Sequence, residues 1–186
     1  MRREGASGPA FETIVAAGAR TSRPHYRPGR AKVRPGQAVL VDWGAKVDGY
    51  CSDLTRVVFT GTIPRKLAEI YGLVVRAQAA GMASLRPGAL CRSADVAARE
   101  VICRGGYAGG LLHGLGHGIG LAVHEAPSLY KACRDRLRAG MVVTVEPGIY
   151  LPGFGGIRIE DDVLVTRGGP EKLSRLPVAL KAMVLR

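Results

Sequence analysis

The stretches VRPGQAVLVDWG (33–44) and LRAGMVVTVEPG (137–148) are two versions of one segment, and they determine how the rest of the chain is interpreted. The likeness resumes downstream of each copy, where DGYCSDLTRVV (48–58) aligns with GGIRIEDDVLV (155–165). Each copy reads as a strand, a turn and a second strand. This repeat predicts two similar hairpins within one chain.

The repeat places four acids at matching points of the two hairpins. Asp42 aligns with Glu146, and Asp53 aligns with Glu160. Strands favour apolar or β-branched residues at such positions, and buried carboxylates are rare unless they are paired. The four acids therefore predict a metal site built by duplication.

The register of the first hairpin brings two of these acids together. A two-residue turn at Asp48-Gly49 is a strong hairpin signal and makes Asp42 face Thr55. Asp53 is then a diagonal neighbour of Asp42 on the same face, about 7–8 Å away at the backbone. Two such carboxylates would repel each other, and divalent cations remove that repulsion. The alternative is a pair of solvated strand acids, which the second copy argues against.

The histidines give a second cluster of candidate ligands. Three of the four lie in the glycine-punctuated segment 111–127, and one lies in the Pro- and Arg-rich loop 22–30. They are His113, His117, His124 and His25. In extended backbone the first two share one face and His124 takes the other. A single histidine is more often structural than a ligand, but an acid-rich site with imidazole suits Mn, Fe, Co or Zn.

The remaining pattern predicts a single α+β domain over residues 1–186, with no linker. Predicted strands are 11–17, 38–43, 50–59, 141–146 and 157–166. One helix opens at Thr62 and Pro64 and runs to about 85, and a second runs from Ser93 as N-cap to Gly105. A short segment at 177–184 closes the chain.

Composition narrows the class of protein. The chain is 47% hydrophobic over 186 residues, which excludes a wholly disordered chain. No apolar run approaches the ~20 residues that a membrane span requires, so no membrane partner is expected. The four cysteines show no ligand-like spacing, which favours a reduced, cytoplasmic setting. The net charge of +12 suggests nucleic acid, but the basic residues are scattered and carry no recognisable motif, so none is expected.

These features together resemble the pita-bread metallopeptidases, in particular the Xaa-Pro aminopeptidase and prolidase branch. The matching stretches are VDWGAKVDGYCSDLTR (41–56), HGLGHGIGLAVHE (113–125), TVEPGIY (144–150) and GIRIEDD (156–162). Intervals of 11, 64, 29 and 14 residues separate Asp42, Asp53, His117, Glu146 and Glu160. The resemblance implies a pita-bread fold, a pseudo-twofold pair of hairpin-plus-helix halves.

By the same resemblance, two divalent ions, Mn or Co with Zn or Fe as alternatives, sit between the hairpins. Asp42 would hold one ion, His117 and Glu146 the other, and Asp53 and Glu160 would bridge both. Glu146 would also act as general base, and His124 would polarise the scissile carbonyl. His25 would line the substrate pocket and His113 would support the ligands. Arg158 would neutralise a bridging acid.

The resemblance implies hydrolysis of short peptides with proline at the second position, and it allows a homodimer. Relatives in this branch usually carry an N-terminal lobe and an opening helix before the strand at 11–17. This chain is therefore expected to be an N-terminally truncated catalytic domain that lacks its first helix. Two alternatives stay open: a catalytically silent pita-bread binding module, and a methionine aminopeptidase.

Overall fold

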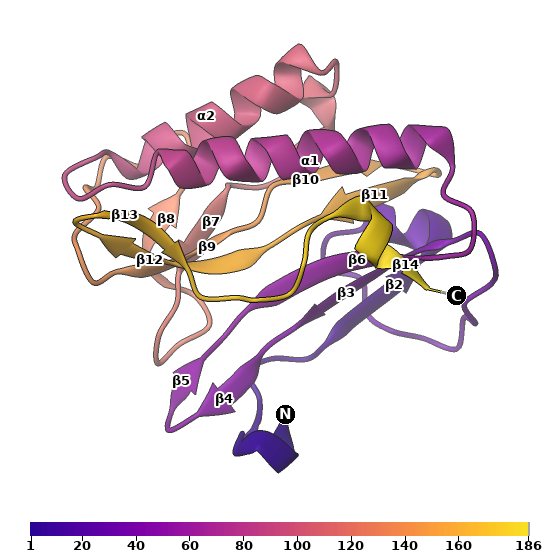
Figure 1. The fold of residues 1–186 in the computed structure, drawn as a ribbon, viewed down its shortest axis with the longest axis horizontal. Coiled ribbons are helices and arrows are strands. Elements are labelled where there is room, and N and C mark those ends of the chain that lie inside the picture. The colour runs from indigo at the N-terminus through magenta and orange to yellow at the C-terminus, as the bar shows by residue number, and fades with distance from the viewer. Residues whose placement is uncertain (186) are drawn as a thin grey trace.

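A computed structural model describes residues 1–185 as two helices and two main sheets, with helix α1 (Arg65–Ala83) and helix α2 (Cys91–Arg104) on one side of the strands (Figure 1). The first sheet has the order β14-β6-β3-β2 and the second the order β13-β12-β9-β7-β8. The first comprises β2 (Ile14–Ala17), β3 (Ala38–Trp43), β6 (Leu54–Thr60) and β14 (Val184–Leu185). The second comprises β7 (Gly116–Gly118), β8 (Glu125–Leu129), β9 (Val142–Val145), β12 (Asp161–Thr166) and β13 (Gly169–Lys172).

Short pairs of strands extend the two hairpins beyond the main sheets. They are β4 (Ala45–Val47) with β5 (Tyr50–Cys51), joined by β1 (Gly8–Pro9), and β10 (Gly148–Leu151) with β11 (Gly155–Arg158). Single 3-10 turns lie at Arg2–Glu4, Gly18–Ser22, Ala108–Gly110 and Leu180–Met183. Along the chain, β3, β4, β5 and β6 form the first copy of the repeat, and β9, β10, β11 and β12 form the second. The predicted pseudo-twofold pair of hairpins is therefore confirmed.

The predicted register of the first hairpin is confirmed. Val47 pairs with Tyr50, and Asp42 pairs with Thr55. Asp48 and Gly49 both have positive φ, 49° and 87°, as a two-residue turn with the right twist requires. The turn chemistry therefore sets which face of β3 carries the acid.

The predicted long strands at 50–59 and 157–166 are each broken in two, which the sequence pattern did not predict. The first break contains Asp53, between β5 and β6, and the second contains Glu160, between β11 and β12. Glu146 likewise lies just past the end of β9. At these breaks the strand ladder is interrupted, so the backbone groups of the acids need partners from elsewhere.

Several predicted boundaries were wrong by a few residues. The strand at 11–17 begins only at Ile14, and the first helix ends at Ala83. The second helix begins at Cys91, so Ser93 lies inside it and is not the N-cap. Its predicted end is confirmed, because Gly105 follows the last helical residue. Packing of Cys91 in the core, at 0% exposed, favours the earlier start over a serine cap.

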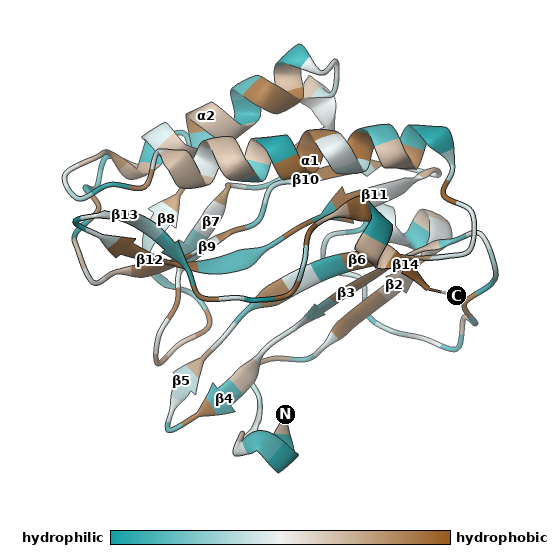
Figure 2. Cartoon of the chain, viewed as in Figure 1, coloured by the Kyte–Doolittle hydropathy of each residue, from teal (hydrophilic) through white to brown (hydrophobic). Residues whose placement is uncertain are grey.

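The core lies between helix α1 and the strands. Phe59 of β6 packs edge-on against Tyr71 of α1, with ring centroids 6.0 Å apart. The buried side-chain amide of Gln78 donates to the carbonyls of Val145 and Ile159, at 3.1 and 3.3 Å, next to the breaks that carry Glu146 and Glu160. Figure 2 shows brown hydrophobic segments along α1 and the strands facing it. Helix α1 therefore fixes the second hairpin where the acids lie.

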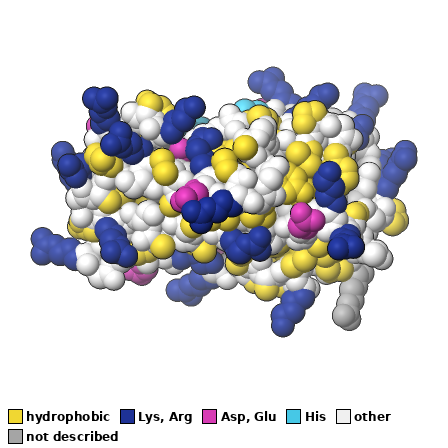
Figure 3. All heavy atoms as spheres, turned by 90° about the horizontal axis from the view of Figure 1, so that it is seen from above, with side chains coloured by type: hydrophobic (Ala, Val, Ile, Leu, Met, Phe, Trp, Pro, Cys, Tyr) yellow, Lys and Arg dark blue, Asp and Glu magenta, His cyan; other side chains and the backbone are white. Residues whose placement is uncertain are grey.

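The outer face over the helices carries no single charged patch. Figure 3 shows Lys and Arg side chains spread over this face, with hydrophobic and acidic side chains between them. Among residues 1–185, no helix combines the length and apolarity of a membrane span.

Candidate metal centre

One cavity of about 330 Å³ gathers every side chain predicted to act in the site. Its lining includes all four acids of the repeat and all four histidines, together with Arg158. These residues come from strands β3 and β11, from the breaks in both hairpins, from β7 and its flanking segments, and from the loop 22–30. Residues more than 100 positions apart in the chain therefore converge because the two halves face each other.

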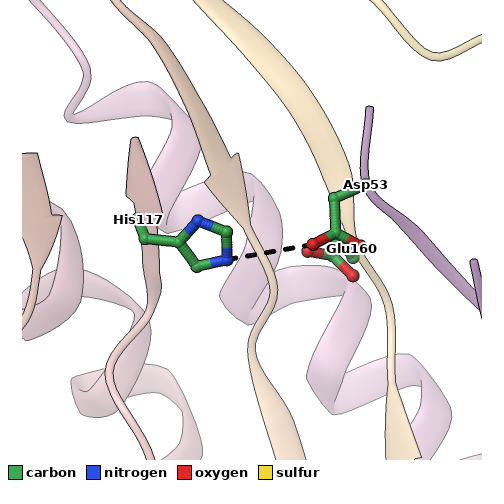
Figure 4. Close-up of side chains that lie close together, drawn as sticks. All are labelled: Asp53, His117 and Glu160. Atoms are coloured by element: carbon green, nitrogen blue, oxygen red, sulfur yellow. Dashed lines mark ion pairs between the residues drawn. The ribbon is translucent and has the colours of Figure 1, made fainter. Parts of the chain in front are cut away.

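His117 is oriented as a metal ligand would be. Its Nδ1 lies 3.0 Å from the carbonyl oxygen of Gly118, which can only accept, so Nδ1 carries the proton and Nε2 keeps its lone pair. That Nε2 lies 3.4 Å from Glu146 Oε1 and 3.9 Å from Asp53 Oδ2. Figure 4 shows the ring pointing at Asp53 and Glu160. Ligand atoms of these last two acids and His117 all lie within 4.8 Å of one another.

The glycines around His117 let it approach the second hairpin. A Cβ on Gly116 would lie 2.0 Å from the carbonyl oxygen of Thr144, so no side chain fits there. The Thr144 hydroxyl accepts the backbone N–H of His117 at 3.1 Å and lies 3.3 Å from Glu146 Oε1. The glycine pattern thus allows His117 to lie beside β9.

His124 joins His117 in spite of their opposite parity. Their ring centroids lie 4.2 Å apart, because the segment between them turns rather than staying extended. His124 and His25 are both exposed and line the cavity, as the entrance to a site would require.

Arg158 pairs with an acid other than the one predicted. Its guanidinium donates to Asp42 Oδ2 across the two hairpins, whereas a bridging acid was expected as its partner. Arg158 lies on β11, opposite Gly148, and its side chain crosses to the first sheet, where it also donates to Thr55 Oγ1 at 3.1 Å. It therefore compensates the charge of Asp42.

His113 supports this arginine through Tyr150. The Arg158 guanidinium donates to the Tyr150 hydroxyl at 2.9 Å, and that hydroxyl lies 2.8 Å from His113 Nε2. Because His113 Nδ1 lies 2.7 Å from the carbonyl oxygen of Gly114, Nε2 accepts the tyrosine proton. Burial lowers the pKa of His113 to about 4, which keeps the ring neutral.

The acids resist ionisation in the protein without metal. Burial, followed by the charges of Asp42 and Glu146, raises the pKa of Asp53 to about 9. Burial raises the pKa of Glu146 to about 7, partly offset by Arg158. Burial and the charges of Glu146 and Asp53 raise the pKa of Glu160 well above its usual value. A site whose carboxylates repel each other this strongly is poised to gain cations.

Unpartnered oxygens support the same conclusion. Within residues 1–185, five buried carboxylate oxygens have no hydrogen-bond partner, and three of them belong to Asp42, Asp53 and Glu160. Such atoms are rare in folded proteins and call for an explanation such as an ion. Carboxylates with one imidazole are a donor set that Mn²⁺, Co²⁺, Fe²⁺ and Zn²⁺ accept. The residues present therefore fit a divalent-metal site.

Replacing Arg158 by methionine should destabilise the metal-free protein by about 3 kcal/mol, because the buried carboxylate of Asp42 loses its partner. Urea unfolding measures this change. The matched control is Arg104→Met: the Arg104–Glu100 side chains are 78% and 56% exposed, against 4% and 11% for Arg158 and Asp42. The control should change the free energy of unfolding by less than about 1 kcal/mol. Equal effects of the two variants would contradict a structural ion pair at Asp42.

Three contributing residues escaped the sequence-based predictions. They are Tyr150, Thr144 and Thr55. Tyr150 and Thr144 give no local signal, because their roles depend on contacts with other strands. The predicted register placed Thr55 opposite Asp42, and that position could have identified it.

Known proteins resemble this chain in sequence and in fold. The chain is 41% identical over 175 residues to an Xaa-Pro dipeptidase of Pyrococcus furiosus, covering 94% of this chain and 50% of that protein. An uncharacterized Bacillus subtilis peptidase, YqhT, is 44% identical over 180 residues, 97% of this chain and 51% of its own. The solved Xaa-Pro dipeptidase from Bacillus anthracis superposes with a TM-score of 0.96 at 43% identity, covering 99% of this chain and 51% of that one.

The structural likeness to these proteins confirms the pita-bread fold. The match covers only part of the length of each relative. The chain spans about half the length of the curated relatives it matches. The model of metallopeptidase family M24 matches residues 1–167, which include all five predicted metal ligands. The chain therefore belongs to metallopeptidase family M24.

Proposed function

We propose that this chain is a metallopeptidase catalytic domain that hydrolyses the Xaa-Pro bond of short peptides, as a dipeptidase or an aminopeptidase. The observation that supports this most is the single cavity in which five candidate ligands meet three further histidines. Relatives described as Xaa-Pro dipeptidases, at about 41% identity, supply the substrate class. Free cysteines at all four positions fit the reducing cytoplasm as its setting.

Five side chains would hold two divalent ions, with Mn or Co preferred. Asp42 would bind one ion, His117 and Glu146 the other, and Asp53 and Glu160 would bridge both. Ions held in this way lower the pKa of a bound water and neutralise charge that develops on the substrate oxygen.

Glu146 is the proposed general base. It lies just past the end of β9 with its side chain 17% exposed, and its Oε1 lies 3.4 Å from His117 Nε2 in the same cavity. In this role Glu146 would take a proton from the attacking water and give it to the leaving amine. The Thr144 hydroxyl donates to its Oε1 at 3.3 Å, and its Oε2 lies 3.9 Å from Arg158 Nε.

His124 is proposed to donate a hydrogen bond to the scissile carbonyl oxygen. His124→Ala should lower kcat about 100-fold with little change in KM, because the contact strengthens as charge develops on that oxygen. Steady-state kinetics with an Xaa-Pro dipeptide measure the split. A pure rise in KM would assign His124 to substrate binding instead.

His25 and His113 take supporting roles in this proposal. His25 is exposed at the cavity mouth beside Pro24 and would contact the peptide. His113 acts through Tyr150 and Arg158 and keeps Asp42 in place. A homodimer would be compatible with this arrangement.

The test of this function is a substrate panel with the Mn²⁺- or Co²⁺-loaded full chain. Ala-Pro, Ala-Pro-Gly and Met-Ala-Ser separate a dipeptidase, an Xaa-Pro aminopeptidase and a methionine aminopeptidase. We expect cleavage of one or both proline peptides, and loss of cleavage in EDTA. Cleavage of Met-Ala-Ser alone would favour the methionine aminopeptidase. Metal binding without any cleavage would favour a silent binding module.

A further inference from the structure

The backbone of Asp53 needs a partner that its own hairpin does not provide. Asp53 lies in the break between β5 and β6, where the ladder with β3 and β4 is interrupted. The residue is 6% exposed, so an unpaired N–H there would lose its hydrogen bonds with water. A partner must come from another part of the molecule.

The opposite hairpin supplies that partner. Asp162 of β12 accepts the backbone N–H of Asp53 on its Oδ2 at 3.0 Å, in a buried contact between residues 109 positions apart. Asp162 is itself fixed, because Ser174 Oγ accepts its N–H at 3.2 Å and Leu173 donates to its carbonyl at 2.9 Å. A carboxylate is the strongest acceptor that a side chain offers to a backbone N–H.

The counterpart of Asp162 in the first hairpin contacts the acid of the second hairpin, there through its backbone carbonyl and its hydroxyl. Thr55 follows Asp53 by two residues, as Asp162 follows Glu160, so the two are counterparts in the aligned copies. The carbonyl of Thr55 accepts the backbone N–H of Glu160 at 3.1 Å, and its hydroxyl donates to Glu160 Oε2 at 2.6 Å. Each hairpin thus holds the acid of the other one.

The two cavities beside Asp53 show on which side of that residue Asp162 lies. Asp53 lines both the 330 Å³ cavity of the site and a second cavity of about 450 Å³, while Asp162 lines only the second. Asp162 therefore lies behind Asp53 and does not face the substrate. An additional acid beside four others is electrostatically costly, so its presence needs a specific reason.

We propose that Asp162 is a positioning residue that fixes the bridging carboxylate of Asp53 across the two halves, as its counterpart Thr55 fixes Glu160. The inference rests on the proposed metal centre but not on the choice of substrate. Groups that orient metal ligands typically change metal affinity about 10- to 100-fold when they are removed.

The test compares two variants with the same side-chain branching in the full chain. Asp162→Asn keeps a carbonyl oxygen for the Asp53 N–H, and Asp162→Leu keeps the branched shape but removes the acceptor. We expect Leu to weaken binding of the second Mn²⁺ at least about 10-fold by calorimetry and to reduce the exchange-coupled dimanganese signal in electron paramagnetic resonance. Asn should stay within about threefold of wild type and keep that signal.

Circular dichroism and thermal unfolding of both metal-free variants establish that they fold. If Asp162→Leu does not fold, Asp162→Ala replaces it, because alanine also removes the acceptor, and loss of coupling is then expected for Ala and not for Asn. Wild-type affinity and coupling in Asp162→Leu would overturn the inference, as would equal damage by Asn and Leu. Wild-type protein that binds two ions but cleaves no proline peptide would refute the proposed function. The comparison of the Asp162 variants would still test the inference, because it measures metal binding and not peptide cleavage.

Discussion

Replacing Glu146 by glutamine is expected to lower kcat for an Xaa-Pro peptide by about 10³-fold or more. The amide cannot accept the proton of the attacking water, a loss that alone costs about 10²- to 10⁴-fold. It also removes a negatively charged ligand beside His117, whose Nε2 lies 3.4 Å from Glu146 Oε1. The variant should therefore bind its metals more weakly as well.

The measurement combines steady-state kinetics with metal analysis of the same samples at saturating Mn²⁺. Glu171→Gln is the matched control, because Glu171 is an exposed glutamate on β13 away from the cavity. The control should keep wild-type kcat. A Glu146→Gln enzyme that retains both ions and more than about a tenth of the activity would contradict the assigned base.

Removing the metals should make the stability of the protein strongly dependent on pH. Without metal the folded protein holds protons on Asp53 and Glu146, with pKa values of about 9 and 7, and on Glu160, whose pKa is also raised. The unfolded chain releases these protons near pH 4. Between about pH 4 and pH 9 the folded state therefore binds more protons, and its stability falls as pH rises.

Each extra proton contributes about 1.4 kcal/mol per pH unit. We expect the Tm of the EDTA-treated protein to fall by at least about 5 °C from pH 5 to pH 8. Metal-loaded protein keeps these ligands deprotonated, so its Tm should change less and the gap between the two forms should widen with pH. Scanning calorimetry of both forms checks this, and parallel Tm curves would contradict it.

The local features of the fold were predictable from the repeat and the turn chemistry. Asp48-Gly49 set the register that placed Asp42 opposite Thr55, because a one-residue slip would turn every side chain to the other face. The four acids stood out because strands seldom bury carboxylates. The glycine-punctuated segment 111–127 is also a local signal, because Gly116 makes a close backbone approach to Thr144 that a side chain would prevent.

The breaks in the strands and the contacts between the halves were not predictable in this way. The alternating pattern of the strands continues through Asp53 and Glu160, so nothing in it indicates a break. At the breaks, the backbone N–H groups of these acids are bound by Asp162 and Thr55 of the opposite hairpin. The direct pairing of Arg158 with Asp42 was not predicted either, because sharing a strand with Glu160 did not reveal that its side chain crosses to the first hairpin. Hydrogen-bond and ion-pair partners that come from distant parts of the chain cannot be predicted from the spacing of residues along one strand.

The central claim is that the duplicated hairpins and His117 together hold a pair of divalent ions. Anomalous diffraction at the manganese edge, from crystals of the full chain grown with Mn²⁺, tests it most directly. We expect two peaks about 3.5–4 Å apart, with Asp53 and Glu160 contacting both and Asp42 contacting only the peak farther from His117. A single peak, or two peaks that the five residues do not contact, would contradict the account.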